Sequence, residues 1–275
     1  MARSSIPQIT LRSGQLIPQV GLGFWQVKDA EQFDTAFAAA IKAGYRHFDS
    51  AQIYKNEGML GDAWTKSGLD RKEVFLTTKI SIGNFQKAKL EKSFAESLQK
   101  LQTDYVDLLL LHFPVTGLRK GAWKALEAIR QEGGAKSIGV SNYTIRHLES
   151  LKKYAAIVPD VNQVELHVFL QQPELVQYCQ DNNIVVEAYS PLAHSREMND
   201  ETIKCIAAKH NRSYAQIMLR WLIERGLVVL PKSVTPSRIE ENIALFDFAL
   251  DEEDMTAIAG CERDLRTCWS PVHVP

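Results

Sequence analysis

The chain has 275 residues, of which 45% are hydrophobic and 24% charged, with a formal net charge of -1 at pH 7. This composition is ordinary for a globular protein, and the balanced charge argues against nucleic acid or an anionic membrane surface as the main partner. The N-terminus lacks the apolar core of a signal peptide and no run is long enough to span a membrane, so we expect a cytoplasmic protein. The four cysteines form no CxxC pair, which disfavours a metal site.

The first predicted element is a hairpin over residues 8–20, QITLRSGQLIPQV, with its turn at Ser13 and Gly14. Eight apolar runs of strand length follow. Several of them do not alternate with polar residues, which is typical of parallel strands buried on both faces. The runs lie near residues 20–24, 45–49, 74–79, 105–112, 137–142, 161–165, 184–190 and 227–233.

Helical patterns lie between these runs. Apolar residues share one helical face over 33–41, 90–101, 123–129 and 214–222, and Gly44 and the pair Gly133 and Gly134 lie where helices should end. About eight alternating units predict a (β/α)8 TIM barrel, with the hairpin as a plug at its bottom. No linker interrupts the chain, so residues 1–275 are predicted to form one domain. An open doubly wound sheet is the second choice, but GLGFWQ at residues 21–26 fails the GxGxxG pattern.

Polar residues collect at the predicted carboxyl ends of the strands, where barrel enzymes place their chemistry. A lone lysine there usually just reaches solvent, and a lone histidine is more often structural than catalytic. Their joint placement is stronger evidence, because a barrel would bring several of these side chains into one small space. The residues are Asp49, Lys79, His112, Ser141, Asn142, Gln163, Glu165, Tyr189, Ser190, Lys232 and Ser233.

Three of these polar residues, together with the nearby Tyr54, predict acid–base chemistry on a carbonyl group. Lys79 and Asp49 should form a partly buried ion pair, and the ammonium group should lower the pKa of the nearby Tyr54 phenol from about 10 towards neutrality. Tyr54 could then donate a proton to a developing alkoxide, while His112 donates a hydrogen bond to the same oxygen. A general acid without a nucleophile suits carbonyl reduction, with the hydride supplied by a cofactor.

Other residues are suited to holding such a cofactor. Ser141, Asn142 and Gln163 could bind a carboxamide, and Tyr189 could stack on a flat ring. In the run PKSVTPSRIEEN at 231–242, two cations and hydroxyl groups precede or begin a helix, which predicts an anion site that would favour NADP over NAD. The run also suits a simple helix cap at Thr235 and Pro236, and the two interpretations are compatible.

Seven motifs, in this order, make the whole chain resemble the aldo-keto reductases: GYRHFDSAQIYKNE, TTK at 77–79, DYVDLLLLHFP, IGVSN, VNQVELH, AYSPL and LPKSVTPSRIEEN. The resemblance implies a barrel that binds NADPH (or NADP+) without a Rossmann motif. It also implies a catalytic tetrad of Asp49, Tyr54, Lys79 and His112, with Tyr54 as proton donor.

The same resemblance implies the cofactor contacts. The nicotinamide would lie against Ser141, Asn142, Gln163 and Tyr189, with Ser190 and Leu192 as further contacts. The adenosine and its 2′-phosphate would lie against Lys232, Ser233, Val234, Arg238, Glu241 and Asn242.

Within the family, SAQIYKNE and LQKLQTDYVDL resemble the bacterial 2,5-diketo-D-gluconate reductases, which also reduce methylglyoxal and assorted aldehydes. At two positions that border the substrate in relatives, Ile80 and Phe113 replace tryptophans that are common in the family. Trp25, Ile80, Phe113 and Trp269 are the predicted substrate wall, although barrel packing explains Ile80 and Phe113 nearly as well. A short loop after Pro114 and a short tail suggest an open mouth for small, polar or varied carbonyls.

Two other functions stay open at this stage. Some barrels of this family attach to channel complexes as nucleotide-sensing regulatory subunits, but here all four tetrad positions are present. A metal-dependent barrel hydrolase has only the fold in its favour, and fold alone does not set function. Relatives are often monomers, so we expect a monomer with a small-molecule carbonyl as its partner.

Overall fold

The computed structural model describes residues 6–195 and 199–275. Its main sheet has eight parallel strands in the order β10-β9-β8-β7-β6-β5-β4-β3, so strands adjacent in sequence are also adjacent in space. The strands are β3 (Leu22–Gly23), β4 (His47–Asp49), β5 (Phe75–Ile80), β6 (Val106–Leu111), β7 (Ala135–Ser141), β8 (Val161–Glu165), β9 (Val185–Tyr189) and β10 (Val228–Leu230).

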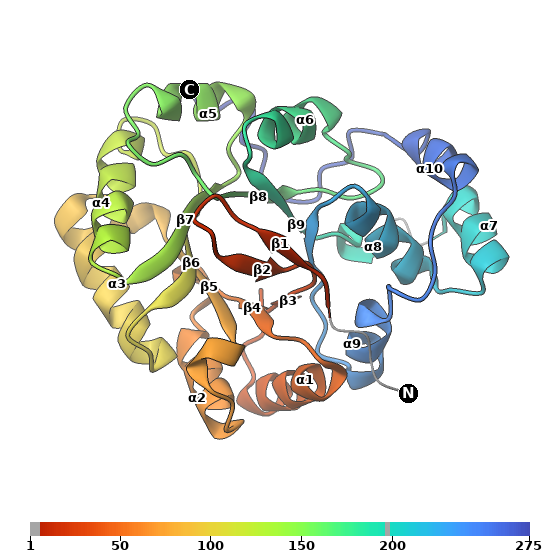
Figure 1. Ribbon diagram of the computed structural model, residues 1–275, viewed down its shortest axis with the longest axis horizontal. Coiled ribbons are helices and arrows are strands. Elements are labelled where there is room, and N and C mark those ends of the chain that lie inside the picture. Colours follow the sequence, from red (N-terminus) through yellow and green to blue (C-terminus); the bar gives the residue numbers. More distant parts are fainter. Residues whose placement is uncertain (1–5, 196–198) are drawn as a thin grey trace.

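Helices surround the ring of strands (Figure 1). They are α1 (Ala30–Ala43), α2 (Glu57–Lys66), α3 (Lys87–Leu101), α4 (Arg119–Gln131), α5 (Ile145–Lys152), α6 (Pro173–Asp181), α7 (Glu201–His210), α8 (Tyr214–Glu224), α9 (Pro236–Ile243) and α10 (Glu252–Ala259). The predicted (β/α)8 barrel is confirmed. Gly44 ends α1 with a φ of 105°, a left-handed conformation that glycine adopts at little cost. None of the described helices is both long and apolar enough to cross a bilayer.

The barrel closes where β3 meets β10. Val20 and Val229 form a parallel bridge, and the Gly21 amide donates to the Val229 carbonyl at 2.9 Å. A Cβ atom at Gly21 would lie 2.7 Å from both the His47 ring and the Leu230 side chain. Glycine is therefore required at this seam, because any side chain there would displace a residue of the barrel interior.

A hairpin of β1 (Gln8–Thr10) and β2 (Leu16–Pro18) lies across one end of the barrel, as predicted (Figure 1). Its turn is held by hydrogen bonds to residues near the start of three barrel strands. The Ser13 amide donates to Asp160 Oδ1 at 2.7 Å, its hydroxyl lies 2.7 Å from that of Ser137, and the Gln15 amide donates to Asp107 at 2.8 Å. The hairpin thus covers the amino ends of the strands and leaves their carboxyl ends open.

Candidate active site

The four tetrad residues meet at the carboxyl ends of the strands. Asp49 ends β4 and Lys79 lies near the end of β5, while His112 directly follows β6. Tyr54 ends a short 3-10 helix, Gln52–Tyr54, which follows β4 after two residues. The Tyr54 and His112 rings meet edge to face with centroids 5.7 Å apart, and Lys79 Nζ lies 3.4 Å from the Tyr54 hydroxyl. The structure brings these four residues together, as the sequence predicts.

Lys79 is fully buried and fully paired. Its ammonium group donates to Asp49 Oδ1 at 2.5 Å, to Asp49 Oδ2 at 2.7 Å and to the Ser50 carbonyl at 3.0 Å. Burial by itself favours the neutral amine, but the Asp49 carboxylate opposes this and the pKa of Lys79 is raised above its usual value. Lys79 therefore stays charged beneath the Tyr54 hydroxyl.

The sequence-based prediction that the Tyr54 pKa falls towards neutrality is wrong. Burial disfavours the phenolate and raises the pKa of Tyr54. Lys79 acts in the opposite direction, but Asp49 offsets part of its effect, so burial prevails. Tyr54 is consequently protonated at neutral pH, which is the state that a proton donor needs.

His112 is neutral. Burial and the nearby Lys79 ammonium together lower the pKa of His112 to about 3. A neutral imidazole still has one N–H, so it can donate a hydrogen bond to a carbonyl oxygen without adding a second positive charge beside Lys79.

The residues predicted to hold the nicotinamide form one connected group. Ser141 and Gln163 are direct neighbours across β7 and β8. The Tyr189 hydroxyl donates to Asn142 Oδ1 at 2.7 Å, and Asn142 Nδ2 donates to the His112 carbonyl at 3.1 Å and to Ser141 Oγ at 3.1 Å. Because Asn142 bonds to the backbone of a tetrad residue, these side chains border the same space as the tetrad.

The residues predicted to hold the adenosine phosphate lie at the start of α9. Lys232 and Arg238 are exposed, and neither has an ion pair among the residues that the structure describes. Thr235 is the N-cap and Pro236 the first helical residue, as predicted, but the Thr235 side chain makes no capping hydrogen bond. Instead Ser233 Oγ accepts from the Thr235 amide at 3.1 Å. Free cations beside a helix N-terminus fit a phosphate group.

Three other predicted cofactor residues lie close by on the same segment. Val234 packs against the core, Asn242 is buried on α9, and Glu241 accepts a hydrogen bond from the Ser213 hydroxyl at the start of α8. The Glu241 carboxylate is thus already hydrogen-bonded within the protein.

The predicted substrate wall divides into exposed and buried members. Trp25 and Trp269 are 40% and 70% exposed, and the Trp269 ring meets the edge of Phe113 with centroids 6.4 Å apart. Ile80 is fully buried in the hydrophobic core. The rings of Phe113 and Trp269 therefore lie next to each other. That all four residues form a wall of the substrate site stays a prediction.

Two predicted cofactor residues lie beyond the end of β9. Ser190 has a positive φ of 47°, and its hydroxyl lies 2.8 Å from His194 Nε2. Leu192 is partly buried against the core.

Glu165, at the end of β8, holds the C-terminal segment against the barrel. Its carboxylate accepts from the Thr267 amide and hydroxyl, each at 2.6 Å, and from the Cys268 amide at 3.1 Å. Trp269 follows directly, so one carboxylate fixes the backbone next to the most exposed member of the predicted wall.

Two buried titratable residues inside the barrel, His47 on β4 and Glu187 on β9, were not among the predicted site residues. The sequence does contain a signal for Glu187, since a carboxyl group within the apolar run IVVEAY is costly to bury without a partner. Gln163 is that partner, and its amide nitrogen donates to Glu187 Oε2 at 2.5 Å and to Asp49 Oδ2 at 3.0 Å.

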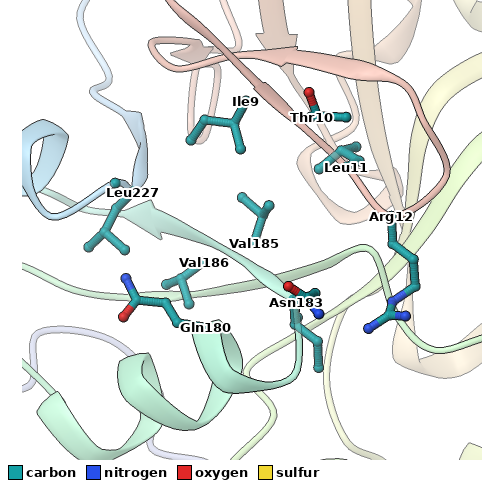
Figure 2. Close-up of a pocket in the computed structure, with 11 residues that line it drawn as sticks. Ile9, Thr10, Leu11, Arg12, Gln180, Asn183, Val185, Val186 and Leu227 are labelled. Atoms are coloured by element: carbon teal, nitrogen blue, oxygen red, sulfur yellow. The ribbon is translucent and has the colours of Figure 1, made fainter.

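A cavity of about 470 Å³ lies at the opposite end of the barrel, between the hairpin and the segments around α6, β9 and β10 (Figure 2). It is lined mainly by aliphatic side chains such as Ile9, Val186 and Leu227, and Arg12 is its only titratable residue. Arg12 already donates to the Asn182 carbonyl at 2.6 Å. This cavity has no groups for proton transfer, so it is not the candidate active site.

The sequence pattern described as the aldo/keto reductase family matches residues 19–263. The chain belongs to the aldo/keto reductase family. Similar family members include the glyoxal reductase of Bacillus subtilis strain 168, which is 42% identical over 96% of this chain and 95% of its own length. The methylglyoxal reductase DkgA of Escherichia coli O157:H7 is 40% identical over 94% of each chain.

The fold agrees with solved structures of the family. A Bombyx mori aldo-keto reductase in complex with NADP is 34% identical and superposes with a TM-score of 0.91, covering 96% of this chain and 95% of the other. As a member of this family, the chain is an oxidoreductase. Its candidate catalytic residues are those of the tetrad, and not those at the barrel end that the hairpin covers.

Proposed function

We propose that this aldo/keto reductase uses NADPH to reduce aldehydes and ketones to alcohols, with Tyr54 as the proton donor. The carbonyl substrates would be small dicarbonyls, keto sugars such as 2,5-diketo-D-gluconate, and aromatic aldehydes. The main support is the position of Lys79 Nζ, which lies 2.5 Å from Asp49 and 3.4 Å from the Tyr54 hydroxyl. The named activities of the glyoxal and methylglyoxal reductases support dicarbonyls as substrates.

The residues of this chain fit the reaction as follows. When bound, NADPH would supply the hydride that adds to the carbonyl carbon. Tyr54 would give its hydroxyl proton to the carbonyl oxygen as the C=O π bond breaks, and the Lys79 ammonium would stabilise the phenolate that remains. His112 would donate a hydrogen bond to the same oxygen and so fix the orientation of the carbonyl group.

A panel of carbonyl compounds tests this proposal directly. We expect loss of NADPH absorbance with glyoxal, methylglyoxal, 2,5-diketo-D-gluconate and a nitrobenzaldehyde, and unchanged rates after treatment with a chelator. Tight NADPH binding without turnover on any of them would contradict a reductase and favour a nucleotide-sensing regulatory subunit instead.

Replacing Arg238 with alanine should weaken NADPH binding far more than NADH binding. A hydrogen bond from a guanidinium to a phosphate contributes roughly 1.5–3 kcal/mol, so the NADPH dissociation constant should rise about 10- to 100-fold. Fluorescence titration with each cofactor measures both constants. Arg12→Ala, at the opposite end of the barrel, is the matched control. Equal changes for the two cofactors in Arg238→Ala would argue against a 2′-phosphate contact.

We also propose that the enzyme works as a monomer in the cytoplasm. None of the four cysteines forms a disulfide bond, which suits a reducing compartment. Light scattering on the purified enzyme would measure its mass, and a dimer would contradict this part of the proposal.

A further inference from the structure

A connected group of polar side chains lies inside the barrel beneath the tetrad. His47 on β4, Gln163 on β8 and Glu187 on β9 are all buried, and Gln163 and Glu187 are direct neighbours in the strand register. Buried polar groups at the centre of a barrel are costly unless they are paired. Hydrogen bonds here run from Asp49 through Gln163 to Glu187, and His47 Nε2 lies 3.4 Å from Glu187 Oε1.

The two carboxyl groups fix the orientation of the Gln163 amide. Gln163 Nε2 lies 3.0 Å from Asp49 Oδ2 and 2.5 Å from Glu187 Oε2. Carboxyl oxygens in this position accept, so the amide nitrogen must face them and its two hydrogens are used. The Gln163 carbonyl oxygen is then the atom that remains to accept a hydrogen bond from a ligand, and a carboxamide NH2 is such a donor.

His47 and Glu187 approach each other, but Glu187 Oε1 is buried and has no hydrogen-bond partner among the described residues. His47 Nδ1 lies 3.3 Å from the Pro18 carbonyl, which can only accept, so Nδ1 bears a hydrogen. His47 Nε2 lies 3.4 Å from Glu187 Oε1 and 3.2 Å from Thr77 Oγ1. A neutral imidazole of this tautomer has a lone pair at Nε2, which would repel a carboxylate. A proton on Glu187 Oε1 would remove that repulsion.

We propose that Glu187 is a positioning residue with two effects. It holds the Gln163 amide so that the carbonyl oxygen faces the nicotinamide carboxamide, and together with His47 it keeps one proton inside the barrel, so that no second negative charge develops beside Asp49. This inference rests on the placement of the nicotinamide against Gln163 in the proposed function.

The protonation of these residues agrees with the geometry. Burial, reinforced by Asp49, raises the pKa of Glu187 to about 8, and burial lowers the pKa of His47 to about 3. The charged groups that face Glu187 are Asp49, Lys79 and the potentially charged His47, while β10 contributes only aliphatic side chains. At neutral pH Glu187 therefore holds a proton. Above about pH 8 its loss would add a negative charge facing Lys79 and Asp49, which would offset the ammonium charge that stabilises the Tyr54 phenolate.

Ligand binding separates a positioning role from a general structural role. We would titrate wild type, Glu187→Ala and Val186→Ala, a control for packing on the same strand, with NADPH and with 2′-phospho-ADP-ribose, which lacks the nicotinamide. Loss of the anchored Gln163 acceptor should raise the dissociation constant of Glu187→Ala for NADPH about tenfold. Binding of 2′-phospho-ADP-ribose should change less than about twofold.

The pH profile supplies a second readout that does not depend on Glu187→Ala being well folded. Glu187→Gln has the shape of the protonated acid and cannot ionise. We expect kcat/KM for glyoxal reduction by wild type to fall above about pH 8, and the corresponding inflection to be absent in Glu187→Gln.

Three results would overturn these assignments. Equal losses for the two ligands in Glu187→Ala, or an inflection retained in Glu187→Gln, would overturn the role of Glu187 alone. Wild-type enzyme that binds both ligands equally tightly would instead overturn the nicotinamide placement, and with it the proposed function at Gln163.

Discussion

Replacement of Tyr54 by phenylalanine is expected to lower kcat for glyoxal reduction about 10²- to 10⁴-fold, the usual contribution of a positioned general acid. The change removes only the hydroxyl group. The ring should keep its edge-to-face contact with His112, and its centroid should stay 4.9 Å from Lys79 Nζ. NADPH binding should therefore be retained. Steady-state kinetics and fluorescence titration with NADPH measure the two properties separately.

Tyr45→Phe is the matched control for this substitution. Tyr45 is a buried tyrosine whose hydroxyl donates to the Ile239 carbonyl at 3.2 Å, away from the tetrad. Its loss should cost about 1 kcal/mol of unfolding free energy and leave turnover in place. If Tyr54→Phe retained turnover to the same degree as Tyr45→Phe, Tyr54 would not be the proton donor.

Lys79→Met is expected to abolish most turnover and to destabilise the fold by about 3–5 kcal/mol, because it leaves the Asp49 carboxylate buried without its cation. Methionine keeps much of the lysine's length and apolar volume, so the loss reports on charge more than on packing. Chemical denaturation gives the free energy of unfolding, and NADPH oxidation gives the rate.

The double variant Lys79→Met/Asp49→Asn separates stability from activity. With both charges removed, no uncompensated charge remains in the interior, and the stability should recover towards wild type while turnover stays low. A double variant as unstable as Lys79→Met alone would show that the stranded carboxylate is not the cause of the loss.

The barrel and the place of its chemistry could be predicted because both depend on local patterns. Strands buried on two faces have continuous apolar sequences. Because the strands are parallel, the polar residues that end these sequences all lie at the same end of the barrel. Asp49 and Lys79 could therefore be placed together from the sequence. The turn at Gly14 and the end of α1 at Gly44 follow from local backbone requirements.

Features that depend on closure of the barrel could not be predicted. The bond between Gln163 and Asp49 joins residues 114 apart in sequence, and His47 meets Glu187 only because β4 and β9 face each other across the interior. The acidity of Tyr54 was predicted from the nearby cation alone. The structure shows that burial has the larger effect, and burial cannot be read from sequence spacing.

The attachment of the C-terminal segment through Glu165 separates two properties of the enzyme. Proton transfer depends on side chains of the barrel interior. Trp269, by contrast, belongs to a segment outside the strands that is held by hydrogen bonds to Glu165, Phe169 and Gln172. Exchange of that segment between relatives could therefore alter which carbonyls are accepted while the acid–base residues keep their geometry. Substrate specificity can therefore diverge through changes in this C-terminal segment, while the residues of the barrel interior stay unchanged.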